Sequence, residues 1–170
     1  MTHRSRHDAD VACAREAVGL KDVDREGWKR VGIARPESVA AHSWGVAFLA
    51  LLRCPAGLDR GKVLAMAVLH DLAEVRVGDL TPHDGVSRHE KHARERAAMQ
   101  ALLGHRPELL EIWEEAEAGV TQEARFVKHL DRADMGLQAE RYMQGGADVS
   151  EFLASAAEGM RTVLGVTAGA

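Results

Sequence analysis

A run of seven apolar residues leads directly into three ionisable side chains. The run covers residues 63–69 and consists of good helix formers, so it predicts a helix that is buried on most of its sides. His70, Asp71 and Glu74 follow at once, and buried ionisable groups are costly unless they find a partner or a metal ion. On a continued helix His70 and Glu74 share a face, with Asp71 about 100° further round. This stretch is therefore predicted to form the floor of a metal site.

The composition indicates a helical protein with one core. The chain has 170 residues, enough for one domain with a sizeable core. Aromatic residues make up only 4% of it, so the core must be built from Ala, Leu, Val and Met, which favours helices over sheet. There is no internal repeat or linker. Residues 1–170 are therefore expected to form one domain, with a core over about 10–165, a loose N-terminus over 1–9 and a frayed tail over 165–170.

The charge and the cysteine pattern argue against several classes of protein. The net charge of −4 disfavours binding to a nucleic-acid polymer or to an anionic membrane surface. A small anionic ligand stays compatible, because a metal ion and a few arginines reverse the sign of the charge locally. Cys13 and Cys54 form no CxxC pair, and residues 1–10 lack the apolar stretch of a signal peptide. No run approaches the ~18–20 apolar residues of a membrane span. A cytoplasmic protein without a membrane partner is expected.

Capping residues and hydrophobic periodicity mark out further helices. Ser38 is placed to cap a helix that ends near Pro55, Thr121 to cap a long one, and Pro107 begins a short one. The segment 75–85 contains two glycines and a proline and is typical of a loop. The expected helices lie at about residues 10–20, 38–54, 59–74, 87–103, 107 onwards, 121–142 and 149–163.

A histidine with metal-ligand chemistry lies on an apolar helix face. His42 belongs to a stripe with Val39 and Val46 at helical spacing. A lone histidine in such a stripe is more often a core residue than a ligand. The pair His70 and Asp71 changes that balance, because it supplies a second set of ligand groups.

A carboxylate on the long predicted helix completes the set. Asp131 lies between Val127 and Met135 on one face, and Asp134 is its rival. Two imidazoles and two carboxylates suit a borderline or hard divalent ion such as Zn, Mn, Co, Ni or Fe(II). Such an ion brings the pKa of bound water to about 7–9, from about 15.7 in bulk water. The candidate ligands are His42, His70, Asp71 and Asp131.

The segment 21–36 is the most basic short part of the chain, with Arg25, Lys29, Arg30 and Arg35. Composition alone favours a solvated connector, and the alternative is a loop that binds an anion beside the metal.

Other candidates lie further along the chain. Asp79, in the predicted loop, is close enough to Glu74 to line the same cavity. His89 and His92 have a spacing that a metal site permits, but they lie among charged residues, so a solvated face is favoured for them.

Four motifs give the chain a resemblance to a known family. They are REGW at residues 25–28, RPESVAAHS at 35–43, HDLAEVRVGDL at 70–80 and VKHLD at 127–131. In this order they resemble the HD-domain phosphohydrolases, and within them most closely the 5′-deoxynucleotidase branch. The resemblance covers about residues 18–142. It implies an all-α helical bundle of the HD-domain type that binds one divalent metal ion and removes phosphate from nucleoside 5′-monophosphates, often with a preference for 2′-deoxy sugars.

The resemblance also implies roles for particular residues. The metal ligands are the four named above, and Glu74 orients or deprotonates the attacking water. Arg25 holds the phosphate and Trp28 packs against the sugar. Asp79 contacts a sugar hydroxyl or assists the leaving group. Because members of this family commonly dimerise, a homodimer is implied as well.

Two alternatives stay open. A dinuclear iron HD-type oxygenase needs extra ligands between Asp71 and Asp131, for which His92 and His105 are the candidates, although both have polar neighbours in the sequence. Two irons per chain would favour it over a hydrolase with one ion. A non-catalytic nucleotide-binding module that keeps the metal for structure is the other alternative, and the presence of every expected catalytic group argues against it.

Overall fold

The described part of the chain, residues 3–169 of a computed structural model, consists of helices and connecting loops without a β-strand. The predicted all-α class is confirmed. The elements in chain order are α1 (His3–Ala17), η1 (Val18–Asp22), α2 (Glu26–Arg30), α3 (Val39–Arg53), α4 (Arg60–Leu69), α5 (Glu74–Val77), α6 (Arg88–Leu103), α7 (Pro107–Ala118), α8 (Gln122–Gln144) and α9 (Ser150–Leu164).

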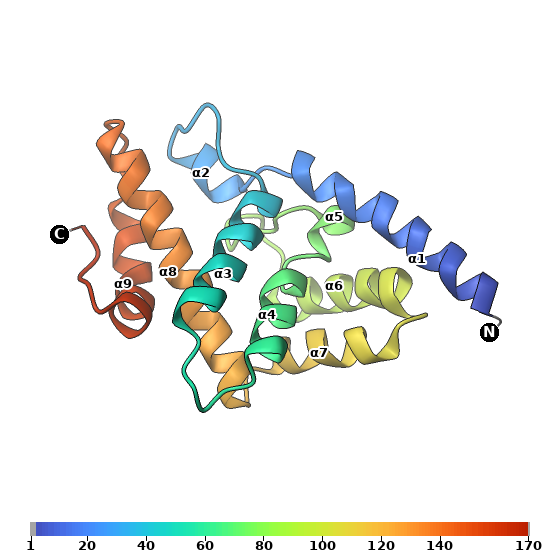
Figure 1. The fold of residues 1–170 in the computed structure, drawn as a ribbon. Coiled ribbons are helices and arrows are strands. Elements are labelled where there is room, and N and C mark those ends of the chain that lie inside the picture. Colours follow the sequence, from blue (N-terminus) through green and yellow to red (C-terminus); the bar gives the residue numbers. More distant parts are fainter. Residues whose placement is uncertain (1–2, 170) are drawn as a thin grey trace.

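Three helices form the centre of the molecule. α3, α4 and α8 lie side by side, and α9 packs along α8 (Figure 1). Between the central helices lies the largest buried cluster, which includes Val46, Met66 and Leu130, each with no exposed surface. α9 approaches α8 closely because glycines meet there: a Cβ on Gly136 or Gly159 would collide with atoms of the other helix. Among residues 3–169, no helix combines the length and apolarity needed to cross a membrane.

Side-chain caps explain where several helices begin. The hydroxyl of Ser38 accepts a hydrogen bond from the Ala41 backbone N–H at 3.2 Å, and α3 starts at the next residue. Ser87 and Thr121 cap α6 and α8 in the same way, and such caps satisfy backbone donors that a helix start leaves unpaired. α7 begins at Pro107. The predicted starts of these helices are therefore confirmed.

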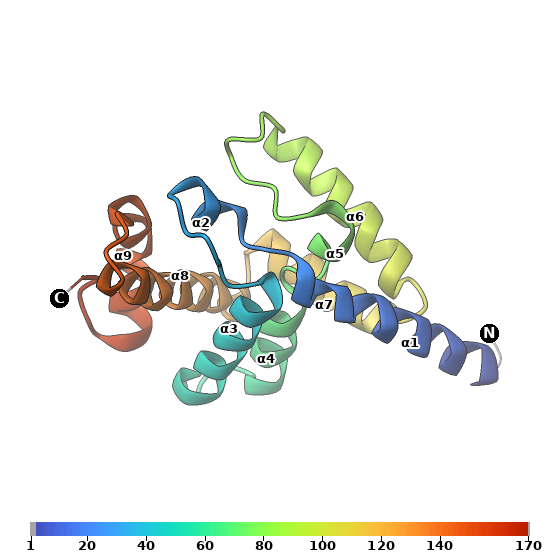
Figure 2. The same ribbon diagram turned by 90° about the horizontal axis from the view of Figure 1, so that it is seen from above.

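The N-terminal prediction is wrong for the residues that the structure describes. Residues 3–9 were expected to be loose, but they belong to α1, which begins at His3 and ends at Ala17. The chain then continues to Asp22 as a 3₁₀ turn. α1 is held at one end of the molecule, opposite to α9 (Figure 2), by ion pairs of Arg6 and Asp10 with residues at the start of α7. Residues 1, 2 and 170 lie outside the described range. At the other terminus, the tail after α9 is not helical.

The predicted central helix is also wrong in one respect. α4 ends at Leu69, and residues 70–73 form a turn before the short α5 begins at Glu74. In this turn the N–H of Glu74 bonds to the carbonyl of Asp71 at 3.0 Å, the tighter i→i−3 pattern of a helix end. His70 and Glu74 therefore do not share a face of one continuous helix.

Candidate metal centre

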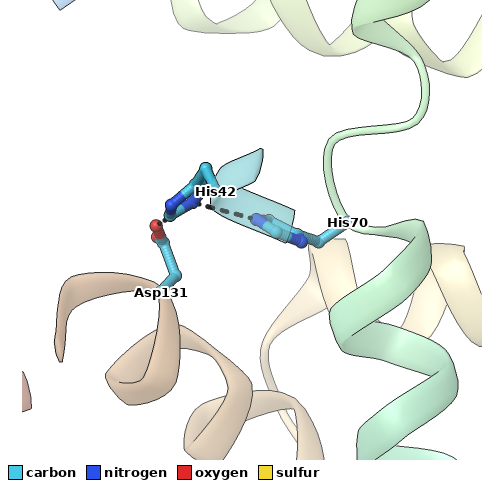
Figure 3. A group of neighbouring side chains, drawn as sticks. All are labelled: His42, His70 and Asp131. Carbon is cyan, nitrogen blue, oxygen red and sulfur yellow. Dashed lines mark hydrogen bonds and ion pairs between the residues drawn. The ribbon is translucent and has the colours of Figure 1, made fainter. Parts of the chain in front are cut away.

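Three side chains from α3, the end of α4 and α8 meet in the interior. The Nε2 atom of His42 lies 3.1 Å from Oδ1 of Asp131 and 3.4 Å from Nε2 of His70 (Figure 3). One ligand atom from each of the three lies within 4.8 Å of the others. Asp71 joins them, with Oδ2 3.1 Å from Nε2 of His70 and 3.8 Å from Nε2 of His42. The structure thus brings together all four ligands that were predicted from the sequence.

Both imidazole rings are held in position by a hydrogen bond at Nδ1, the nitrogen that points away from the cluster. Nδ1 of His70 is 2.8 Å from the Ala67 carbonyl oxygen, which only accepts, so Nδ1 donates, and when the ring gives up its second proton Nε2 carries the lone pair that binds a metal. Nδ1 of His42 lies 2.7 Å from Oδ2 of Asp134. Partners of this kind orient histidines that bind metals through the other nitrogen. Asp134, the rival to Asp131, therefore holds His42 from the far side of its ring.

A glycine makes room for this support. A Cβ atom on Gly45 would collide with the carboxylate of Asp134. Gly45 lies on the same helix as His42, so α3 supplies both the ligand and the space for the carboxylate that orients it. Any larger residue at position 45 would push that carboxylate away from the ring.

The carboxylates of the cluster stay ionised. Burial alone would raise the pKa of Asp71, but the positive charge of His70 outweighs it and holds the pKa well below its usual value. Burial opposes ionisation of Asp131 as well, and the hydrogen bond with His42 lowers its pKa to about 2. Burial also opposes protonation of His42, while Asp131 and Asp134 raise its pKa to about 9. The two carboxylates are thus ionised beside positively charged neighbours, and they supply oxygen ligands that suit a divalent cation.

Glu74 provides a test of whether a metal ion fits here. Its side chain is 3% exposed, and Oε2 has no hydrogen-bond partner within residues 3–169. An unpaired buried polar atom carries a cost of about 1–3 kcal/mol, more for a charged group. Burial first, then the negative charges of Asp71 and Asp79, raise the pKa of Glu74. Two imidazoles and two carboxylates form a donor set that suits a divalent ion. A water molecule bound to that ion would give Oε2 of Glu74 the hydrogen-bond partner that it lacks.

Arg25 lies next to the cluster, at the start of α2. Its Nη1 atom is 3.5 Å from Oδ2 of Asp71. Burial opposes its charge, but Asp71 and Asp131 raise its pKa, so the guanidinium stays positive. Asp79 accepts a hydrogen bond from the Glu26 backbone N–H at 2.7 Å and so joins the predicted loop to α2. For Arg25 the anion-binding interpretation of the basic segment fits better than a solvated connector.

Trp28 is more deeply buried than its expected contact with a sugar suggests. It is 1% exposed, and its Nε1–H donates to Oε1 of Glu37 at 3.0 Å. Its ring packs against Tyr142 and Phe152 in a third core cluster. Trp28 nevertheless belongs to the wall of the pocket, and its contact with a sugar stays a prediction.

A pocket of about 440 Å³ opens over the cluster, within the range of small-molecule sites. Its wall includes six predicted residues: Arg25, Trp28, Asp71, Glu74, Asp79 and Asp131. It also includes residues that sequence reasoning missed: Lys91 from α6, Arg132 and Met135 from α8, and Phe152 and Ser155 from α9. Met135 follows Asp131 by one helical turn, which is a signal that was available. The residues of α9 carried none, because only the folded chain brings them near.

The extra ligands that a second iron would need are elsewhere. His105 lies 3.0 Å from Asp10, between α7 and α1. His92 is exposed on α6, lies 3.7 Å from Glu117 and stacks over Trp113. The structure brings neither histidine into the cluster, so the oxygenase alternative is not favoured.

Comparison with known proteins decides the family. Residues 17–164 match the model of the HD domain. The chain belongs to the HD-domain family. The match begins at the last residue of α1, so α1 lies almost wholly outside the part that defines an HD domain.

Relatives of this HD protein carry a common name. It is 43% identical over 128 residues to 5′-deoxynucleotidase HDDC2 of Bos taurus, covering 72% of this chain and 62% of the bovine protein. It is 37% identical over 145 residues to 5′-deoxynucleotidase hdd1 of Schizosaccharomyces pombe, covering 78% and 73% of the two chains. The chain thus spans slightly less than two thirds of the bovine relative.

Solved structures share the fold. A conserved hypothetical protein from Pyrococcus furiosus has a TM-score of 0.75 at 35% identity, over 84% of this chain and 88% of its own. A predicted metal-dependent phosphohydrolase from Magnetospirillum magnetotacticum has a TM-score of 0.72 at 28% identity, over 94% and 87%.

Proposed function

We propose that the protein is a metal-dependent phosphomonoester hydrolase that removes phosphate from nucleoside 5′-monophosphates. The observation that carries this proposal is the convergence of two imidazoles and two ionised carboxylates beside a pocket whose wall includes both carboxylates, an arginine and a glutamate with an unpaired oxygen. The names of the relatives supply the nucleotide, which the geometry alone does not specify.

The metal ligands in this proposal are His42, His70, Asp71 and Asp131. A divalent ion bound there supplies Lewis acidity, which lowers the pKa of water towards 7 and neutralises charge on the phosphate. The ion is Co, Mn, Zn, Ni or Fe(II), one per chain. The mixed nitrogen and oxygen donor set supports an ion of this group rather than a soft, thiolate-seeking one.

The remaining residues act on water and substrate. Glu74 orients the attacking water and accepts its proton. The water oxygen bonds to phosphorus, the bond between phosphorus and the 5′-oxygen breaks, and that oxygen leaves as the nucleoside alcohol with the proton that the water gave up. Arg25 binds the phosphate oxygens. Asp79 contacts the sugar hydroxyl or assists the leaving group, and Trp28 supports the sugar from the pocket wall.

The experiment is phosphate release from a panel of nucleoside 5′- and 3′-monophosphates. Protein stripped with a chelator is assayed with Co, Mn, Zn, Ni or Fe(II) added back. We expect metal-dependent release from 5′-monophosphates only. No release with any ion would refute the proposal, and two irons per chain with oxygen consumption would instead favour the oxygenase.

A homodimer is part of the proposal, and an apolar stripe supports it. Trp44, Phe48, Leu51 and Leu52 lie on the outer face of α3, and each is at least 46% exposed. The rings of Trp44 and Phe48 stack with centroids 5.5 Å apart, and Val68 of α4 is 52% exposed. A contiguous exposed apolar face of this kind marks an interaction surface. The occupant proposed here is the same face of a second copy, as in two-fold symmetric dimers.

Sedimentation tests the dimer. Trp44→Glu is expected to convert a dimer to a monomer without loss of fold, because the side chain is 69% exposed within one chain. Val120→Glu, at a similarly exposed site outside α3, is the control and should leave the dimer intact. A monomeric wild-type protein would contradict this part of the proposal.

A cytoplasmic location is also part of the proposal. It rests on the cysteines: Cys13 and Cys54 are both free thiols, as expected for a chain that works in a reducing compartment.

A further inference from the structure

One wall of the pocket is an apolar shelf in which only Trp28 has a role so far. The shelf consists of Phe152 from α9, backed by Trp28 from α2 and Met135 from α8. Trp28 and Met135 are 1% and 6% exposed, whereas Phe152 is only partly buried. The ring of Phe152 packs against that of Trp28 with centroids 4.2 Å apart. The surface that the shelf offers to a ligand is therefore mainly the phenyl ring.

The position of the shelf relative to the metal ligands is fixed by α8. Asp131 and Met135 are four residues apart on this helix, so they share a face and are separated by about 6 Å along the axis. Both line the pocket. A ligand whose phosphate lies at Asp131 therefore reaches the shelf with the part of the molecule beyond its sugar.

A glycine contributes to the shape of this wall. A Cβ atom on Gly27 of α2 would come within 3.2 Å of the Phe152 ring, closer than most real contacts of this kind. Gly27 also lines the pocket. The absence of a side chain there lets the phenyl ring lie against α2 while one part of it faces the pocket.

The polar side chains around the shelf already have partners. Nη1 of Arg132 donates to the hydroxyl of Ser155 at 2.8 Å. Arg30 forms an ion pair with Glu151 at 2.5 Å. These hydrogen bonds use part of the capacity of the polar groups around the shelf. Stacking needs no hydrogen-bonding group, because every base has an aromatic face.

We propose that Phe152, supported by Met135 and Trp28, is the base-binding surface of this site and stacks on the purine or pyrimidine of the nucleotide. This inference rests on the proposed nucleotidase function and adds to it a specificity: the site requires a base and accepts both purines and pyrimidines. Among residues 3–169, one further aromatic side chain lines the pocket besides Phe152 and Trp28: that of His83, which is exposed on a loop.

The test compares a nucleotide with the same molecule lacking its base. kcat/KM is measured for deoxyadenosine 5′-monophosphate, deoxycytidine 5′-monophosphate and 2-deoxyribose 5-phosphate on one preparation of each variant. The ratio of nucleotide to sugar phosphate does not depend on the fraction of folded protein. Phe152→Ala is expected to lower this ratio about 5- to 100-fold for both nucleotides, the range that loss of one stacking contact gives. Phe152→Trp is expected to restore it.

Leu153→Ala is the matched control. Leu153 is the next residue of α9 and packs against the same core cluster, but it is not part of the pocket lining. It should lower stability and leave the ratio at the wild-type value.

Three outcomes overturn the inference. The first is an unchanged ratio in Phe152→Ala, and the second is a ratio that falls in His83→Ala instead. The third is a wild-type protein that hydrolyses the sugar phosphate as well as the nucleotides, which refutes the shelf while the phosphatase function stands. A wild-type protein that hydrolyses none of the three refutes the function and the shelf together.

Discussion

The molecule contains two clusters built from the same kinds of side chain. The inner cluster lies beside the pocket and consists of Arg25, His42, His70, Asp71 and Asp131. The outer cluster joins α1 to α7 and consists of Asp10, His105 and Arg106. Asp131 and Asp10 have almost equally exposed side chains, 32% and 33%, so the exposure of the aspartate does not explain the difference between the clusters.

The difference lies in how the polar atoms are used. In the outer cluster both oxygens of Asp10 accept hydrogen bonds from Arg106, and one of them is also bonded to His105. Both carboxylate oxygens of Asp10 are therefore already paired within the outer cluster.

In the inner cluster each imidazole is held through Nδ1, so the two Nε2 atoms face each other 3.4 Å apart over the pocket. Arg25 approaches only one oxygen of Asp71. Beside this cluster, Oε2 of Glu74 is buried without a hydrogen-bond partner among residues 3–169, and this unpaired atom distinguishes the inner cluster from the outer one. Four substitutions sharpen this comparison, from the largest expected effect to the smallest.

Asp71→Ala is expected to abolish metal retention and to lower phosphate release more than ~100-fold, because it removes a ligand rather than a supporting group. Metal content by mass spectrometry and phosphate assays measure both. Asp10→Ala, the matched change in the outer cluster, should retain both properties. An Asp71→Ala protein that keeps one ion per chain would remove Asp71 from the ligand set.

Glu74→Ala is expected to keep the metal and to lower kcat about 10²–10⁴-fold, the usual contribution of a general base. Glu95→Ala is the control, because Glu95 is another buried glutamate near Lys91 that does not line the pocket. Turnover close to wild type in Glu74→Ala would exclude Glu74 from the chemistry.

Asp134→Asn tests the support behind His42. It keeps the size of the side chain but removes the charge that orients the ring, so metal affinity should fall about 10–100-fold. Asp148→Asn, an exposed change before α9, is the control. Competition with a chromophoric chelator measures the affinity, and equal values for Asp134→Asn and wild type would show that the ring needs no such partner.

Asp10→Asn is expected to lower Tm by a few degrees at most and to leave phosphate release unchanged, because exposed ion pairs contribute little. The hydrogen bond from Arg106 lowers the pKa of Asp10 from 3.8 to about 2. A depressed carboxylate pKa adds stability above its unfolded value and loses it as the pH falls through the folded one. The difference in Tm between wild type and variant should therefore be full above about pH 4 and disappear towards pH 2. A difference that grows on acidification would contradict this assignment.

Local signals were enough to predict much of the fold and the site. Ser38, Ser87 and Thr121 begin helices where their hydroxyls pair with backbone donors, and these bonds join residues three apart in sequence. His42 and Asp131 were recognisable because each puts a polar group on an otherwise apolar helix face. A polar group in such a place needs a partner whatever the rest of the chain does.

Long-range contacts decided what the sequence could not. Residues 3–9 became helical because Arg6 and Asp10 find partners on α7, about a hundred residues later. The turn at residues 70–73 interrupts a segment whose own composition predicts an unbroken helix. Such long-range contacts cannot be predicted from the hydrophobic periodicity of either segment.

The sequence by itself determined the helical class, most helix starts and the four candidate ligands, because capping and amphipathic periodicity act over a few residues. Only the tertiary structure decided that Asp134 supports His42 while Asp131 faces the pocket. Only the tertiary structure, too, brought Phe152 of α9 to the wall above Asp131. The physical reason is that a side chain's direction follows from its own helix, whereas its neighbours follow from how the helices pack.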